Sequence, residues 1–137
     1  MPSRRSAALW VLALAYAAGI FVLSSFPMPE AAGEPVRLVG TQALHFLEFA
    51  VLAFLLSLAF ASVRSPRVRS KAALLAVAVA VLYAASDEFH QLFVPGRQGD
   101  AVDFLLDSAG AVLGGAVQFL WSRRASRVAP VSGTSPR

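Results

Sequence analysis

Four stretches of the chain are almost free of charged residues and are long enough, or nearly long enough, to cross a lipid bilayer. Residues 7–26 are twenty uncharged residues in succession, and residues 38–63 are interrupted by only one His and one Glu. Residues 72–86 and 108–122 each hold fifteen uncharged residues. A hydrocarbon core of about 30 Å takes about 20 helical residues, so the two shorter stretches must continue into the polar residues beside them. The sequence therefore predicts four transmembrane helices.

The composition is that of a membrane protein rather than a soluble domain. Of the 137 residues, 57% are hydrophobic and only 15% are charged. A soluble core of this size could not bury so much apolar surface, so the excess must face lipid or a partner. The absence of cysteine excludes disulfides, thiolate metal sites and cysteine nucleophiles. Four spans leave no room within this length for a separate soluble domain.

An alternative for the first stretch is a cleaved signal peptide, whose apolar region normally runs about 7–15 residues. Its twenty uncharged residues favour a retained helix instead. We expect a short N-terminal segment at 1–6, one transmembrane domain at 7–122 with spans at about 7–26, 40–62, 71–91 and 103–121, and a disordered basic tail at 123–137.

The charged residues are sorted along the chain by sign. Ten of the twelve Lys and Arg lie in the N-terminal segment, the second connection or the C-terminal tail, whereas all eight Asp and Glu lie elsewhere. Under the positive-inside rule, this pattern places both termini in the cytoplasm and the first and third connections outside. The predicted fold is an all-α, integral membrane four-helix bundle of the plasma membrane. The bases are dispersed between apolar runs, so nucleic acid is not an expected partner.

Ionisable residues of three predicted helices reach the same depth, near the outer face. An ionised side chain facing lipid costs roughly 2.5–3.5 kcal/mol near the bilayer centre, and helical spacing places these residues on faces that can meet. The candidate catalytic residues are Glu48, Asp87 and His90. The candidate substrate-binding residues are His45, Glu88, Gln91, Arg97, Asp103 and Asp107.

Two further features concern packing and loop geometry. Gly110 and Gly114 form a small-xxx-small pattern, which lets another helix approach closely. Between the third and fourth spans, Pro95 and Gly96 occupy the central positions of a predicted type II turn. This turn would direct the side chain of Arg97, either into the acidic cluster or toward an external phosphate or carboxylate.

These residues resemble a known family. The string SDEFHQLFVPGR at residues 86–97, followed by Asp103, Asp107 and the two glycines, is similar to the signature of the VanZ-like membrane proteins. Upstream, HFLEF at residues 45–49 resembles that family's HFxEY element, with Phe49 where Tyr is usual. The resemblance implies a cell-envelope membrane protein. The family's founding member is associated with low-level resistance to the glycopeptide antibiotic teicoplanin.

The main functional hypothesis is an outward-facing polar site that binds, modifies or moves a lipid-linked or cell-wall component. In an enzymatic version, Glu48 or Asp87 would act as a general base, His90 as its proton partner and Arg97 as an anion clamp. One alternative is a metal-dependent membrane hydrolase, because His and carboxylate side chains are metal ligands, although no HExxH motif occurs. Another is a structural or transport helper subunit without catalysis. The expected partners are membrane lipids, with oligomers allowed, and no cofactor is expected.

Overall fold

The long uncharged stretches fold as helices, which confirms the predicted all-α class. The computed structural model describes residues 3–27, 34–97 and 99–128, with side chains for all of these except residues 34–41 and 128. The helices within these ranges are α1 (Arg4–Ser24), α2 (Glu34–Ala61), α3 (Pro66–Ser70), α4 (Ala72–Gln91) and α5 (Ala101–Val128). All of them except the short α3 are long and apolar enough to cross a membrane.

The helix ends follow local capping chemistry. The backbone N–H of Ser6 donates to the side chain of Ser3 over 3.1 Å, which satisfies one of the free donors at the start of α1. Pro66 occupies the first turn of α3 after the extended residue Ser65, a position at which the missing N–H of proline costs nothing. These local signals start α1 and the short helix α3.

Helix α5 is longer than the predicted fourth span. It continues through residues 123–128, which were expected to belong to a disordered tail. No glycine or proline lies between Gly115 and Pro130, and the hydroxyl of Ser126 donates to the carbonyl of Ser122 over 2.9 Å. The rest of the predicted tail, residues 129–137, lies outside the described residues. The segment next to the membrane is therefore helical and basic.

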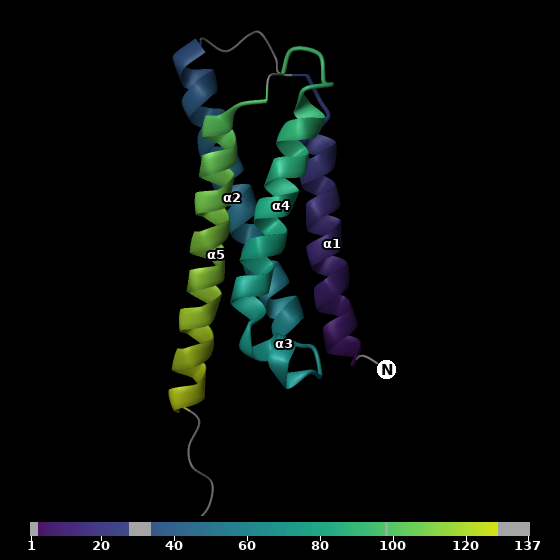
Figure 1. Ribbon diagram of the computed structural model, residues 1–137, viewed down its shortest axis with the longest axis vertical. Coiled ribbons are helices and arrows are strands. Elements are labelled where there is room, and N and C mark those ends of the chain that lie inside the picture. The colour runs from purple at the N-terminus through teal and green to yellow at the C-terminus, as the bar shows by residue number, and fades with distance from the viewer. Residues whose placement is uncertain (1–2, 28–33, 98, 129–137) are drawn as a thin grey trace, which may run out of the picture.

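Helix α2 is the central element of the bundle (Figure 1). It packs most extensively against α5, then against α4, and it also supplies most of the contacts made by α1. Within the described residues, α1 makes no contact with α5. The start of α1, the α2–α3–α4 junction and the end of α5 lie at the same end of the bundle. The three-helix unit α2–α4–α5 is thus the core, with α1 at its side.

Small residues allow this close packing. Helix α4 buries an alanine at every fourth position, at Ala72, Ala76, Ala80 and Ala84, so one narrow stripe of the helix faces the core. The bulkier core residues, including Phe49 and Leu52, come from α2. Large apolar side chains on the other faces remain exposed, for example Leu74 at 68% and Leu82 at 72%. In a membrane these side chains contact lipid.

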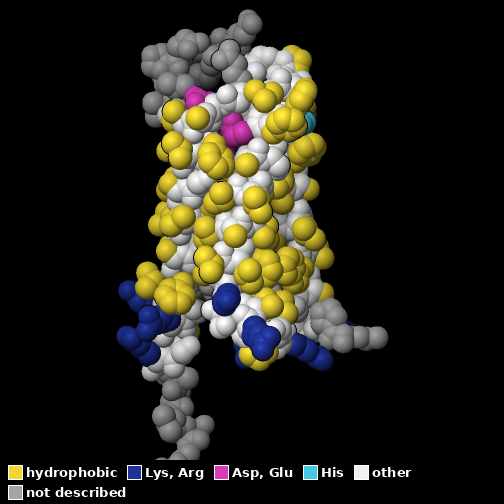
Figure 2. All heavy atoms as spheres, viewed as in Figure 1, with side chains coloured by type: hydrophobic (Ala, Val, Ile, Leu, Met, Phe, Trp, Pro, Cys, Tyr) yellow, Lys and Arg dark blue, Asp and Glu magenta, His cyan; other side chains and the backbone are white. Residues whose placement is uncertain are grey.

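The two ends of the bundle differ in charge (Figure 2). Acidic side chains are visible only near the end at which α4 ends and α5 begins, whereas Lys and Arg gather at the opposite end. Between them, this face shows hydrophobic side chains among white atoms and no charged side chain. We call these ends the acidic end and the basic end. The acidic and basic residues, which are separated along the sequence, therefore lie at opposite ends of the bundle.

Candidate functional site

The acidic end brings together side chains from four helices in two hydrogen-bonded or ionic groups. The first group joins α1 to α4 and is centred on Asp87; we call it the α1–α4 cluster. The second joins α2 to α5 and is centred on Asp107; we call it the α2–α5 cluster. Both aspartates are buried, with exposed fractions of 2% for Asp87 and 0% for Asp107. The two clusters differ in how well their polar atoms are paired.

In the α1–α4 cluster, both carboxylate oxygens of Asp87 have partners. The hydroxyl of Ser24, in the last turn of α1, donates to Oδ1 over 2.6 Å. The side-chain amide of Gln91, one turn along α4, donates to Oδ2 over 2.9 Å. A buried carboxylate with two such donors is stabilised in place. The geometry therefore gives Asp87 the features of a structural anchor for α1.

His90 also faces α1. Its Nε2 lies 3.1 Å from the hydroxyl of Ser25, and its ring is tilted against Phe21 with a centroid distance of 4.6 Å. The spacing of the sequence places His90 near Asp87 along α4, but its contacts are with α1. Among the described residues, His90 and Asp87 therefore bind adjacent serines of one neighbouring helix.

The loop after α4 adopts the predicted type II turn. Gly96 has a φ of 77°, which favours glycine, and the backbone N–H of Arg97 donates to the carbonyl of Val94 over 3.1 Å. The guanidinium of Arg97 then donates to two carbonyls at the end of α1, those of Phe26 at 3.1 Å and Leu23 at 3.3 Å. A cation at this position also interacts favourably with the helix dipole. Arg97 thus binds α1 rather than an acid of the cluster.

In the α2–α5 cluster, the pairing is incomplete. His45 Nδ1 lies 3.5 Å from Asp107 Oδ1, a separation at the outer limit of hydrogen bonding. His45 Nδ1 and both carboxylate oxygens of Asp107 are buried without a hydrogen-bond partner among the described residues. Buried polar groups are normally paired, and an unpaired one is costly. The unpaired atoms of His45 and Asp107 could therefore accept hydrogen bonds from an additional group or donate them to it.

The charge of Glu48 interacts with residues of both clusters. This residue is half-buried on α2, one turn from His45, and its charge interacts with His45, Asp107 and Asp87. No hydrogen bond to its carboxylate is found within the described residues. Glu48 is therefore the predicted catalytic candidate whose carboxylate is least committed to the fold.

Further acids flank the α2–α5 cluster. Glu88 on α4 accepts a hydrogen bond from the backbone N–H of Asp100 over 2.8 Å through one oxygen, while its Oε1 is buried without a partner. Asp103 Oδ1 and the hydroxyl of Ser108, both on α5, are also buried and unpaired in the described part of the chain. The charges of Glu88 and Asp103 interact with each other and with that of His45. The unpaired atoms at the acidic end are thus concentrated around α5.

The α2–α5 contact is set by glycine. A Cβ built on Gly110 would collide with the carbonyl of Phe46, and one built on Gly114 would collide with that of Ala50. The two helices can approach this closely only because both positions have no side chain. This approach brings His45 and Asp107 together, one turn toward the acidic end.

A pocket of about 380 Å³ opens beside Glu88 between α4 and α5. Apolar side chains, including Phe89, Leu92 and Phe104, form most of its lining. Within the described residues, no three His, Asp or Glu side chains are arranged to hold a metal ion. The geometry therefore gives the metal-hydrolase alternative no support, and it places an apolar groove next to a polar cluster.

Sequence reasoning did not identify the partners on α1. Ser24 and Ser25 bind Asp87 and His90, and the hydroxyl of Tyr83 donates to the carbonyl of Ala17 over 2.7 Å. The only signal in the sequence was the position of the serine pair, near the C-terminal end of the first uncharged stretch. Serine is tolerated at many exposed positions, so this signal alone has little specificity.

Comparison with known proteins identifies one family. The family model described as VanZ/LLP1 matches residues 9–122, which include all four membrane-length helices except their extreme ends. No curated protein and no solved structure gives a significant match. The matched region contains both clusters at the acidic end and the packing glycines between α2 and α5. The chain belongs to the VanZ/LLP1 family.

Proposed function

We propose that this membrane protein binds the polar group of a lipid-linked or cell-wall component at the α2–α5 cluster. The observation that supports the proposal is the state of Asp107. It is completely buried, and both of its carboxylate oxygens lack a hydrogen-bond partner among the described residues. A bound polar group would satisfy these atoms and remove the cost of burying them unpaired.

The chemistry of the cluster favours a ligand rich in hydrogen-bond donors. The unpaired carboxylate oxygens belong to Asp107, Asp103 and Glu88, and among the described residues the side chain that can become cationic next to Asp107 is His45. Carboxylates accept hydrogen bonds and do not donate them when ionised. Hydroxyl or amine groups, such as those of a sugar or an amino acid, are therefore the matching chemistry.

An amphiphile also fits the surroundings of the cluster. The apolar groove beside Glu88 can hold part of a hydrocarbon chain while the polar group enters toward Asp107. Such a ligand would reach the site from the bilayer without crossing the apolar interior of the bundle. This arrangement agrees with a component that is already anchored in the membrane.

Binding is better supported than catalysis by the same geometry. Asp87, His90 and Arg97, three members of the hypothetical catalytic set, each hold a group of α1. Only Glu48 keeps a carboxylate without such a partner in the described residues. A catalytic form of the proposal would therefore use Glu48 as the general base, with the α1–α4 cluster as a support.

The proposed location follows from the charge of the two ends. Lys and Arg gather at the basic end, which contains the start of α1 and the end of α5. Basic ends face the cytoplasm in most membrane proteins. We therefore place the protein in the plasma membrane with both termini cytoplasmic and the acidic end outside, where cell-wall components are found.

The test compares a deletion strain complemented with the native chain, with Asp107→Asn, or with Glu48→Gln. Membrane abundance of each variant is measured first, and lipid-linked and cell-wall precursors are then profiled by mass spectrometry. Ser86→Ala is the control, because this exposed polar residue of α4 lies near the same end and lines neither the groove nor the cluster. We expect normal abundance with an altered precursor profile for Asp107→Asn only, or for both cluster variants if Glu48 acts on the ligand.

Two results would contradict the proposal. A native precursor profile in Asp107→Asn at normal abundance would exclude the α2–α5 cluster as a binding site. A loss of abundance in this variant would instead favour the helper-subunit alternative, in which the cluster only holds the helices together. Teicoplanin susceptibility of the same strains tests the link to glycopeptides separately, because a binding site for another envelope component would leave susceptibility unchanged.

A further inference from the structure

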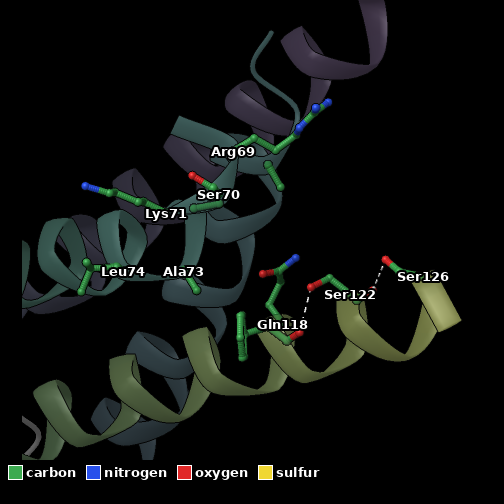
Figure 3. Close-up of a pocket in the computed structure, with 11 residues that line it drawn as sticks. Arg69, Ser70, Lys71, Ala73, Leu74, Gln118, Ser122 and Ser126 are labelled. Atoms are coloured by element: carbon green, nitrogen blue, oxygen red, sulfur yellow. Dashed lines mark hydrogen bonds between the residues drawn. The ribbon is translucent and has the colours of Figure 1, made fainter. Parts of the chain in front are cut away.

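A second pocket lies at the basic end, on the opposite side of the membrane from the proposed site. It has a volume of about 580 Å³ and lies where α3 and α4 meet the second half of α5 (Figure 3). Its polar lining consists of Arg69, Ser70, Lys71, Gln118, Ser122 and Ser126. No acidic residue lines it within the described part of the chain. The pocket is therefore basic and lies at the depth of the lipid headgroups.

Gln118 is the most informative residue of this pocket. Its side chain is only 6% exposed, yet it makes no hydrogen bond with the described residues. Figure 3 shows its carboxamide pointing away from α5 toward the space beneath α3 and the start of α4. Its amide atoms are not among the fully buried unpaired ones, so they reach the pocket while the rest of the side chain is enclosed. Its orientation indicates that the pocket accommodates a polar group.

The start of α4 supplies further donors at the same place. The first-turn N–H groups of a helix have no acceptor within the helix, and Lys71 makes no side-chain hydrogen bond that caps them. Ala72, Ala73 and Leu74, which form this first turn, all line the pocket. The positive end of the helix dipole adds to the charge of the two basic residues. Together these groups favour an anion with several acceptor oxygens.

Two serine hydroxyls of the pocket can accept hydrogen bonds from hydroxyl groups of the same ligand. Ser122 donates to the carbonyl of Phe119 over 2.8 Å, and Ser126 donates to that of Ser122 over 2.9 Å. Because their protons are used in this way, these hydroxyl oxygens remain available as acceptors for a hydroxyl of a ligand. The rim contains exposed apolar side chains as well, with Leu74 at 68% and Phe119 at 46%. An acyl chain can lie against these two side chains.

From these features we infer that the pocket binds an anionic phospholipid whose headgroup bears hydroxyls, such as phosphatidylglycerol. Arg69 and Lys71 are exposed, and Figure 3 shows their charged ends turned away from Gln118, so these flexible side chains turn inward to contact the phosphate. Gln118 and the start of α4 complete its hydrogen bonds, and the serines accept from the headgroup hydroxyls. Basic pockets between membrane helices commonly bind anionic headgroups. The apolar rim distinguishes a lipid from free phosphate, since only a lipid has a chain to place there.

The experiment is native mass spectrometry of the full chain in detergent, titrated with phosphatidylglycerol or with phosphatidylcholine. We compare the native chain with the double variant R69Q/K71Q and with Q118L. The matched control is R124Q/R127Q, which removes the same charge from exposed positions at the same end that do not line the pocket. Circular dichroism verifies that each variant is folded, and Q118L keeps the test valid if the double variant is unstable.

We expect the native chain to retain one phosphatidylglycerol in preference to phosphatidylcholine. Two lost charges should weaken binding roughly tenfold to thirtyfold in R69Q/K71Q, with a smaller loss in Q118L and a change below about twofold in the control. Equal losses in both double variants, equal retention of the two lipids, or native affinity in both R69Q/K71Q and Q118L would overturn the inference. Stabilisation by inorganic phosphate alone that R69Q/K71Q abolishes would overturn the lipid assignment in favour of a soluble anion.

Discussion

The hydroxyl of Ser24 donates a 2.6 Å hydrogen bond to the carboxylate of Asp87, and it links the end of α1 to α4 across 63 positions of the chain. Ser24 is 3% exposed and Asp87 is 2% exposed, so water does not compete for this bond. Hydrogen bonds to charged groups contribute about 1.5–3 kcal/mol. The pair is therefore a principal attachment of α1 to the three-helix core.

Replacing Ser24 by alanine should lower the stability of the bundle by about 1.5–3 kcal/mol, because Asp87 Oδ1 loses its donor. Thermal unfolding in detergent, followed by circular dichroism, measures the change. Ser86→Ala is the control, since this exposed hydroxyl donates to the carbonyl of Tyr83 in its own helix. If both variants unfold together with the native protein, the bond does not stabilise α1.

Gly114→Ala should be far more disruptive than Gly19→Ala. A Cβ at position 114 would collide with the carbonyl of Ala50, so α2 and α5 would have to separate. At Gly19, in α1, nothing lies within 4 Å of the added Cβ, and alanine there should be neutral or stabilise the helix by up to about 1 kcal/mol. Membrane yield and unfolding temperature should fall only for Gly114→Ala. The reverse order would show that α2 and α5 pack differently.

Arg97→Gln should loosen the end of α1, because the guanidinium holds the carbonyls of Leu23 and Phe26. The chain has no cysteine, so a single Phe26→Cys substitution gives an unambiguous site for maleimide labelling. A cation at a helix end contributes about 0.3–1 kcal/mol, which corresponds to a labelling rate about two to five times faster in the variant. Arg124→Gln removes a charge at the other end and should leave the rate unchanged. An unchanged rate in Arg97→Gln would argue against this attachment.

The proposed topology predicts opposite labelling of the two ends. Phe93→Cys, at an exposed position near the acidic end, should react with a membrane-impermeant maleimide in intact cells. Ser70→Cys, exposed at the basic end, should react only after the membrane is permeabilised. Labelling of Ser70→Cys in intact cells would reverse the orientation and move the α2–α5 cluster to the cytoplasmic side.

The sequence was sufficient to predict the four membrane-length helices, because uncharged stretches have one stable form in a bilayer. The sequence also predicted that the acidic residues gather at one end of the bundle. Successive helices run in opposite directions, and the acids lie near the first and third connections, which meet at the same end. It was not sufficient for the pairing. His90 shares a helix face with Asp87 but contacts Ser25, and Arg97 binds carbonyls of α1 that no side-chain pattern reveals.

The physical reason lies in what helical periodicity encodes. A period of 3.6 residues identifies which side chains share a face, but it does not identify the neighbouring helix that this face meets. The stripe of Asp107, Gly110 and Gly114 fits α2 only because the carbonyls of Phe46 and Ala50 lie at the matching height. Such a match depends on the axial offset between two helices, and that offset depends on contacts along their whole length.

The attachment of α1 has a consequence for the order in which the bundle is assembled. Its partners at the acidic end, from Tyr83 to Arg97, are synthesised more than sixty residues after it. During this delay the described end of α1 at the acidic end presents neutral hydroxyls and backbone carbonyls, which lipid and interfacial water tolerate. The charged member of the Ser24–Asp87 pair is the one that arrives last. Helix α1 can therefore be inserted before its partners. The carboxylate of Asp87 then meets the hydroxyl of Ser24 when α4 is inserted.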